Sequence, residues 1–290
     1  MKIPIEYKLQ NLINTYDNFI IDIWGVIHGG GYIYEEAANC LSEIRSNGKN
    51  FIFLSNAPRR ASNVSRILEK KGLPTSLCRD IMSSGEAARI AFSSRSHESI
   101  KSLGKNYLML GTKSDQGLLD NLPYNQVSSL KNADFILGIG LNENTTSVSE
   151  HEDLFRESIH KGITMVCVNP DIEVIREGKK EPCAGALAHK YETLGGSVIY
   201  YGKPYEFIYT LCMNKLENTN KKRTLCIGDG VQTDILGANN FGFDALLITG
   251  GLIANQLNID RSSPAPENSL KKICQQACVK PIAAMPYLSW

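Results

Sequence analysis

Short and almost wholly apolar segments recur along this chain, and helical patterns lie between most of them. Strands with no polar alternation are buried on both faces, which happens when helices cover a parallel sheet. The pattern therefore predicts an α/β fold built on a doubly wound parallel sheet. The expected strands span residues 19–23, 50–54, 106–110, 134–139, 163–168, 197–201, 223–227 and 244–248.

Composition excludes several classes of partner. A net charge of +1 gives no reason to expect nucleic acid or an anionic membrane as a partner. No apolar run approaches the ~18 residues of a membrane span, and residues 1–19 lack the apolar core of a signal peptide. The eight cysteines are scattered without the spacing of a zinc site, so we expect reduced thiols and a cytoplasmic protein.

Polar side chains follow several of these strands at the point where each one ends. Because the carboxyl ends of parallel strands meet at one edge of the sheet, we expect these side chains to gather there. The set contains carboxylates, a hydroxyl, an amide and one cation. It comprises Asp22, Ser55, Asn56, Lys203, Asp229 and Asp234.

Such a set suits phosphoryl transfer. A carboxylate can attack phosphorus and carry the phosphoryl group covalently. The transferred group needs its charge neutralised by a metal ion, a lysine and hydrogen-bond donors. Carboxylate oxygens are the ligands that Mg²⁺ prefers. The residues thus predict a Mg²⁺-dependent site acting on a phosphate.

The order of these motifs resembles that of the haloacid dehalogenase (HAD) superfamily, most of whose members are Mg²⁺-dependent phosphatases. "DIWGV" stands where the family has D-x-D-G-V, and "LSNAPRR", "GKP" and "GDGVQTD" match the later motifs. The resemblance implies that Asp22 is the nucleophile. It also implies that Ser55, with Asn56 beside it, and Lys203 bind the phosphate.

Three further stretches resemble one subclass of that superfamily. "VNPD" (168–171), "CAGAL" (183–187) and "YYGKPYEF" are similar to the subclass that contains nitrophenyl, pyridoxal and phosphoglycolate phosphatases, and D-x-W-G-V resembles one branch of it. The resemblance implies a catalytic core at residues 1–80 and 197–290, with an α/β cap inserted at 81–196. A homodimer formed through the cap is compatible with it.

The same resemblance implies a set of metal ligands. Mg²⁺ would be held by the carboxylates of Asp22 and Asp229 and by the backbone carbonyl of Trp24. Asp234 would complete the set or support it from behind. The alternative for Asp234 is that it caps the helix that follows.

Trp24 raises a question about the chemistry. In the family's phosphatases a second carboxylate at this position protonates the leaving oxygen and later activates water, and indole can do neither. His28 is a candidate replacement, since histidine titrates near neutral pH; the alternative is a hydrogen-bonded loop histidine. Trp24 itself either forms an aromatic wall for the substrate or fills space.

Substrate choice is expected to fall to the inserted region. The stretch "NPDIEVIREGKKEPCAG" (169–185) reads as a loop in which Asn169, Asp171 and Arg176 can meet a polar or anionic substrate. The alternative is a solvated charged loop.

Two functions remain open. The first is a Mg²⁺-dependent phosphohydrolase or phosphotransferase that acts on a small phosphorylated metabolite through a phosphoaspartate. The second is a phosphometabolite-binding or regulatory protein that turns over little because Trp24 has replaced the acid.

Overall fold

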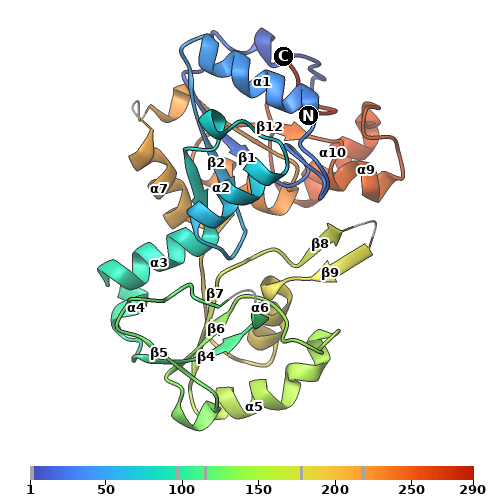
Figure 1. The fold of residues 1–290 in the computed structure, drawn as a ribbon. Coiled ribbons are helices and arrows are strands. Elements are labelled where there is room, and N and C mark those ends of the chain that lie inside the picture. The colour runs from blue at the N-terminus through green and yellow to red at the C-terminus, as the bar shows by residue number, and fades with distance from the viewer. Residues whose placement is uncertain (1–2, 96–97, 114–115, 177–178, 217–219) are drawn as a thin grey trace. The chain divides into compact units, whose positions relative to one another are not determined.

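The computed structural model describes residues 3–95, 98–113, 116–176, 179–216 and 220–290. The chain forms two compact units. The first comprises residues 1–55, 62–82 and 203–290, and the second comprises 56–61 and 83–202. Figure 1 shows that each unit has its own sheet with helices packed around it. That these units act as catalytic core and cap stays a prediction, as do the boundaries 80/81 and 196/197.

The first unit contains a six-stranded sheet in the order β13-β12-β11-β1-β2-β3. The pairs from β13 across to β2 are parallel, as expected for strands joined by helices. Its strands are β1 (Asn18–Asp22), β2 (Asn50–Ser55), β3 (Ile81–Ser83), β11 (Thr224–Gly228), β12 (Asp244–Ile248) and β13 (Ala283–Met285).

The register of this sheet aligns the ends of three strands. Asp22, the last residue of β1, pairs with Leu54, so Ser55 lies one residue beyond it on β2. On the other side Ile21 pairs with Ile227, which places Asp229 just past the end of β11. These polar residues therefore leave the sheet at a common edge.

The opposite ends of the same strands are tied by Asp17. Its carboxylate accepts hydrogen bonds from Arg223 and from Lys49, which precede β11 and β2, and its N–H donates to the Arg223 carbonyl. Bonds from these two cations hold the pKa of Asp17 well below its usual value. The contacts fix β1 between its two neighbours.

Helices surround the strands of the first unit (Figure 1). Helix α1 buries Ala37, Cys40, Leu41 and Ile44, a spacing that puts one apolar stripe against the sheet. The helices of this unit are α1 (Glu35–Ser46), α2 (Ala61–Lys70, whose first residue lies in the other unit), α7 (Glu206–Lys215), α8 (Leu236–Asn240), α9 (Leu252–Leu257) and α10 (Glu267–Gln276).

The second unit contains a five-stranded parallel sheet in the order β10-β7-β6-β4-β5. Phe155 and Tyr191 pack edge to face in its core, 5.3 Å apart between ring centroids, beside Met165. Its strands are β4 (Asn106–Leu110), β5 (Asn125–Val127), β6 (Phe135–Gly138), β7 (Thr164–Cys167) and β10 (Val198–Tyr200), and its helices are α3 (Ser84–Ser94), α4 (Glu98–Lys101), α5 (Glu152–His160) and α6 (Ala184–Thr193).

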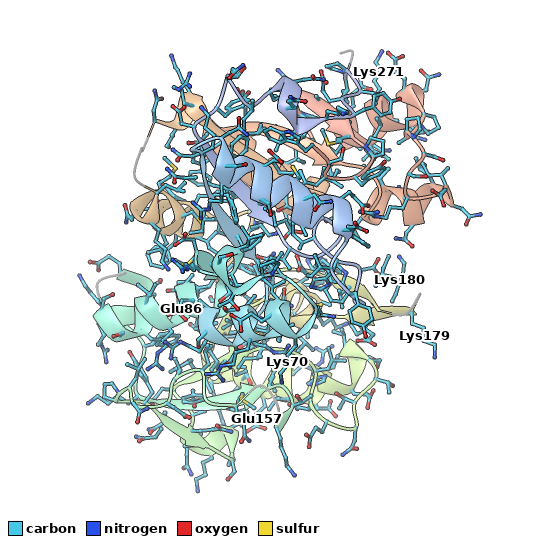
Figure 2. The ribbon with its side chains drawn as sticks, turned by 45° about the horizontal axis from the view of Figure 1, so that its top comes forward. Lys70, Glu86, Glu157, Lys179, Lys180 and Lys271 are labelled. Atoms are coloured by element: carbon cyan, nitrogen blue, oxygen red, sulfur yellow. The ribbon has the colours of Figure 1, made fainter. Side chains whose placement is uncertain are left out.

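A separate hairpin projects from the second unit. Strands β8 (Glu173–Arg176) and β9 (Lys179–Pro182) are antiparallel, and Lys180 forms an exposed ion pair with Glu173 at 2.5 Å. Figure 2 labels Lys179 and Lys180 on this hairpin. The expectation of a loop here is wrong for these residues, because cross-strand pairing outweighs their low strand propensity.

The predicted α/β fold class is confirmed, and each of the expected strands is present. The strands that the sequence did not indicate are short or polar: β3, β5, β8, β9 and β13. Among the described residues, no helix has the length and apolar character that crossing a membrane requires.

Candidate active site

Three buried carboxylates meet at the C-terminal edge of the first sheet. Asp22 ends β1, Asp229 follows β11, and Asp234 lies in the π-helical turn η7 (Val231–Ile235). One oxygen from each carboxylate lies within 4.8 Å of the others, and all three residues are buried. The structure thus brings together the three acidic residues that the sequence singled out.

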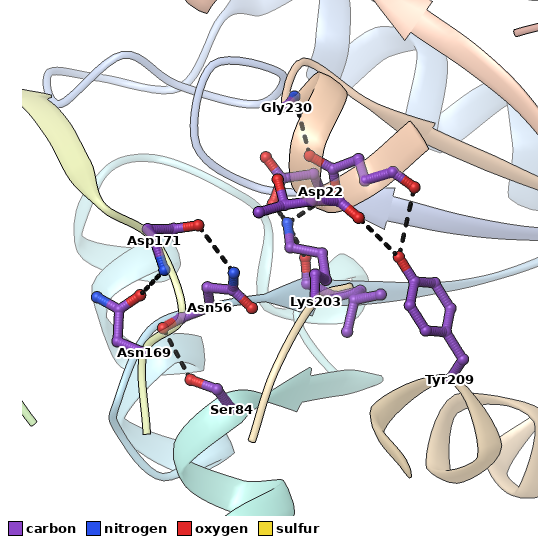
Figure 3. A network of polar contacts seen from close by, with 11 residues as sticks. Asp22, Asn56, Ser84, Asn169, Asp171, Lys203, Tyr209 and Gly230 are labelled. Carbon is purple, nitrogen blue, oxygen red and sulfur yellow. Dashed lines mark hydrogen bonds and ion pairs between the residues drawn. The ribbon is translucent and has the colours of Figure 1, made fainter. Parts of the chain in front are cut away.

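Lys203 provides the positive charge in this group (Figure 3). Its ammonium forms ion pairs with Asp22 and, at 2.8 Å, with Oδ1 of Asp234; the lysine side chain is only 4% exposed. Burial raises the pKa of Asp22 well above its usual value, and the nearby Lys203 opposes that rise.

Asp229 is held by backbone that approaches it closely. Its Oδ2 accepts a hydrogen bond from the Leu252 N–H at 2.9 Å. A Cβ atom on Gly25 or on Gly251 would clash with this carboxylate, and Gly25 has a φ of +81°. The glycines therefore let the chain close around Asp229.

Asp234 does not cap the following helix, contrary to one reading of the sequence. Its Oδ2 accepts a hydrogen bond from Gly230 N–H at 3.0 Å, while its Oδ1 faces Lys203. Tyr209 of α7 braces this turn, since its hydroxyl lies 3.4 Å from the carbonyls of Thr233 and Asp234 (Figure 3).

The three carboxylates fit a divalent cation. One oxygen from each lies within 4.8 Å of the others, and ligands of one octahedral Mg²⁺ lie about 3 to 4.2 Å apart, so the three carboxylates are close enough to share one ion after small shifts. With a single lysine between two of them, the group carries excess negative charge in a buried position. A cation with oxygen preference offsets that charge.

The loop after Asp22 is firmly organised. Trp24 and His28 form an isolated β-bridge, and Gly25 N–H donates to the His28 carbonyl at 2.9 Å. The indole and imidazole rings lie edge to face with centroids 5.1 Å apart. Lys71 donates hydrogen bonds to the carbonyls of Gly30 and Gly31. The loop is therefore fixed from both sides.

His28 is buried in this loop. Its Nδ1 accepts a hydrogen bond from Gly30 N–H at 3.0 Å, which assigns the ring proton to Nε2. Burial, together with the charge of Lys71, lowers the pKa of His28 to about 4. A neutral imidazole with Nδ1 engaged suits a supporting role; the acid–base role stays a prediction.

The remaining predicted residues fall into two groups. Ser55 is buried at the end of β2, within the first unit. Asn56 belongs to the second unit, where its Nδ2 donates to Oδ1 of Asp171 at 2.8 Å, and Asp171 N–H donates to Oδ1 of Asn169 at 3.1 Å (Figure 3). Arg176 ends β8, and its side chain lies outside the described part of the structure.

Some residues of the site escaped the sequence analysis. Ser84 donates from its hydroxyl to the carbonyls of Asn56 and Ala57, at 2.7 Å and 2.9 Å. Tyr209 supports the site from helix α7, and Lys71 supports it from the turn just after α2. These residues act through contacts between distant parts of the sequence, which no local pattern indicates. By contrast, the Gly250-Gly251 pair after a strand is a pattern from which a close approach of the backbone to Asp229 could have been predicted.

Two family models match most of the first unit's segments. A "haloacid dehalogenase-like hydrolase" model matches residues 19–124, and a "HAD-hydrolase-like" model matches residues 200–270. Together they span Asp22, Ser55, Lys203, Asp229 and Asp234.

Individual proteins are similar over most of the chain. The 5'-nucleotidase YutF of Bacillus subtilis is 24% identical over 243 residues, covering 83% of this chain and 90% of that protein. A haloacid dehalogenase-like hydrolase from Brucella suis superposes with a TM-score of 0.83 at 27% identity, covering 98% and 99% of the two chains. Glycerol phosphate phosphatase Rv1692 from Mycobacterium tuberculosis, in complex with magnesium, gives 0.65 at 23% identity, covering 87% and 71%.

Replacing Lys203, which pairs with two of the three carboxylates, tests the electrostatics of this cluster. We expect Lys203→Met, without divalent cations at pH 7, to lower the free energy of unfolding by ~3 kcal/mol, since it leaves buried carboxylates unpaired. The raised pKa of Asp22 means that stability falls as pH rises, and loss of Lys203 raises this pKa further, so the fall is steeper in the variant than in the wild type. The deficit should therefore shrink between pH 7 and pH 5 in urea unfolding.

Lys180→Met is the matched control, because it removes an exposed ion pair with Glu173. We expect a change within ~0.5 kcal/mol. Equal deficits in the two variants, at either pH, would contradict the electrostatic account.

Proposed function

The chain belongs to the haloacid dehalogenase superfamily of hydrolases, and from that premise we propose that it is a Mg²⁺-dependent phosphohydrolase. Its substrate is a small phosphorylated metabolite, and its intermediate is a phosphoaspartate on Asp22. Transfer of the phosphoryl group to an acceptor other than water uses the same site. The names of the similar proteins, a 5'-nucleotidase and a glycerol phosphate phosphatase among them, support a phosphate ester as substrate.

One observation carries the proposal: a buried carboxylate, Asp22, is paired with Lys203 and lies among two further carboxylates at a strand edge. A carboxylate that only stabilised the fold would not need two more beside it, because like charges repel and raise each other's pKa. The arrangement is suited to a metal ion and a phosphate.

The residues divide the work as follows. An oxygen of Asp22 attacks phosphorus, the bond from phosphorus to the ester oxygen breaks, and the leaving oxygen departs with the electron pair. Water then attacks the phosphoaspartate, releasing phosphate and restoring the carboxylate. Lys203, which is paired with Asp22 and Asp234, also binds the phosphate, and the Ser55 hydroxyl and Asn56 donate hydrogen bonds to it.

Asp22, Asp229 and Asp234, with the backbone carbonyl of Trp24, would hold Mg²⁺. When bound, the ion neutralises charge on the phosphoryl oxygens. The protein's own part is to hold the three carboxylates in place, through Lys203 for Asp22 and Asp234 and through Leu252 N–H for Asp229.

With Trp24 at this position, the site lacks the carboxylate that acts as acid and base in the family's phosphatases. The indole offers no proton to a leaving oxygen and no base to an attacking water. His28, with Nδ1 engaged and a low pKa, replaces it poorly. Turnover of alkyl phosphates should therefore be slow. The presence of Trp24 at this position is also the observation that favours the second candidate, a phosphometabolite-binding or regulatory protein.

Asn169, Asp171 and Arg176 are proposed to select the substrate from the second unit. Asp171 and Asn169 form a hydrogen-bonded turn, which gives them a defined geometry. The proposed location is the cytoplasm, since all eight cysteines are free thiols.

A panel of phosphate esters assayed with Mg²⁺ tests the proposal. We expect hydrolysis of at least one ester, its loss in EDTA, and a fall of at least ~10³-fold in Asp22→Asn, because the nucleophile is gone. Asp17→Asn, at the other end of β1, is the control and should keep its activity. Binding of phosphate with no hydrolysis of any ester would favour the second candidate instead.

A rate series over leaving groups tests the consequence of Trp24. In the wild type we expect kcat/KM to fall steeply from phenolic to alkyl phosphates. Trp24→Asp should raise the rate on alkyl esters by up to ~10²-fold and change aryl esters far less, since general acid catalysis is worth ~10²–10⁴.

Trp24→Asn is the matched control, because it shrinks the side chain without adding a proton donor. A gain in Trp24→Asn equal to that in Trp24→Asp would refute the acid–base explanation. A steep dependence appearing only in His28→Ala, with a shallow one in the wild type, would show that His28 is the acid.

A further inference from the structure

Trp24 lies on a short segment whose two ends both contact the cluster of three carboxylates. Asp22 is one of the carboxylates, and Gly25 packs directly against the carboxylate of Asp229. Trp24 lies between them, and its side chain is half-buried, so part of the indole is open to solvent. This exposure leaves room for contact between Trp24 and a ligand.

The indole is also held in place. The His28 ring meets it edge to face at 74°, and a Cβ on Gly30 would lie 3.4 Å from its Cη2, so bare backbone packs against the ring. Gly30 is fixed in turn by its N–H bond to His28 Nδ1 and by Lys71. A ring fixed before binding loses little conformational entropy on contact with a ligand.

Some exposed apolar side chains lie close in sequence to residues of the site. Among the described residues the exposed large apolar side chains are Tyr7, Tyr32, Ile172, Tyr205 and Leu252. Of these, Tyr32 follows the glycine loop, Tyr205 lies two residues after Lys203, and Leu252 gives its N–H to Asp229. Exposed apolar surface near buried charge is typical of a site for a ligand that is part anionic and part apolar.

We infer that Trp24 is a specificity-determining residue that stacks on a planar leaving group, and that the substrates are phosphate monoesters of aromatic hydroxyl compounds. The inference deepens the proposed function and rests on it. In the reaction, Asp22 forms the new bond to phosphorus and the aromatic oxygen leaves as a phenolate. This anion is stable enough to leave unprotonated, so the aromatic leaving group also suits a site without a carboxylate at position 24.

Binding of phosphonates, whose carbon–phosphorus bond resists hydrolysis by Asp22, separates stacking from chemistry. The chain has two tryptophans, so Trp290→Phe leaves Trp24 as the sole indole reporter. In that background, with Mg²⁺, we compare phenylphosphonate with cyclohexylphosphonate and with inorganic phosphate. The two rings match in size and differ in planarity.

We expect phenylphosphonate to quench Trp24 fluorescence and to bind roughly three- to ten-fold more tightly than cyclohexylphosphonate, the range that aromatic pairing gives. In the variants, where calorimetry replaces fluorescence, Trp24→Phe should keep most of this preference and Trp24→Leu should lose it. Tyr7→Leu, which removes an exposed aromatic ring from a segment without site residues, is the control and should change nothing.

Equal affinity for the two ring phosphonates, or a preference that survives in Trp24→Leu, would overturn the inference even if esters are hydrolysed. A preserved ring preference without hydrolysis of any ester would overturn the proposed reaction and leave the stacking role standing. Failure of every phosphonate and of inorganic phosphate to bind would overturn both.

Discussion

The site depends on the cost of burying three carboxylates side by side. Asp22, Asp229 and Asp234 repel one another in a buried place, and Lys203 forms ion pairs with two of them. Neutral backbone groups add hydrogen bonds: Leu252 N–H donates to Asp229, and Gly230 N–H donates to Asp234. The excess charge is the reason we propose this edge of the sheet as the place for a cation and a phosphate.

Holding such a group requires backbone that fits closely, and this explains the glycines around it. Gly25 and Gly251 press on Asp229, and Gly228 could not carry a Cβ without striking Asp234. The loop from Trp24 to Gly31 is in turn locked by His28 and Lys71. This rigidity fixes the position of residue 24, so in the proposed reaction its identity would have a direct chemical consequence.

The sequence predicts the fold class and the acidic group well, because both depend on local patterns. Apolar runs such as 223–227 identify buried strands, and parallel strands must bring Asp22 and Asp229 to one edge. It fails where pairing is made by distant residues, as in the charged hairpin of β8 and β9. The Asn56–Asp171 hydrogen bond joins residues more than a hundred positions apart, and no periodicity could indicate it.

The central claim is that Asp22 carries the phosphoryl group. The direct measurement is intact-protein and peptide mass spectrometry after rapid acid quench of the enzyme with an aryl phosphate and Mg²⁺. The account predicts a mass increase of one phosphoryl group on the peptide containing Asp22, formed at least as fast as phenol is released and decaying slowly, since Trp24 cannot activate water. Phenol release without any phosphorylated peptide, or a phosphoryl group carried on another residue, would contradict it.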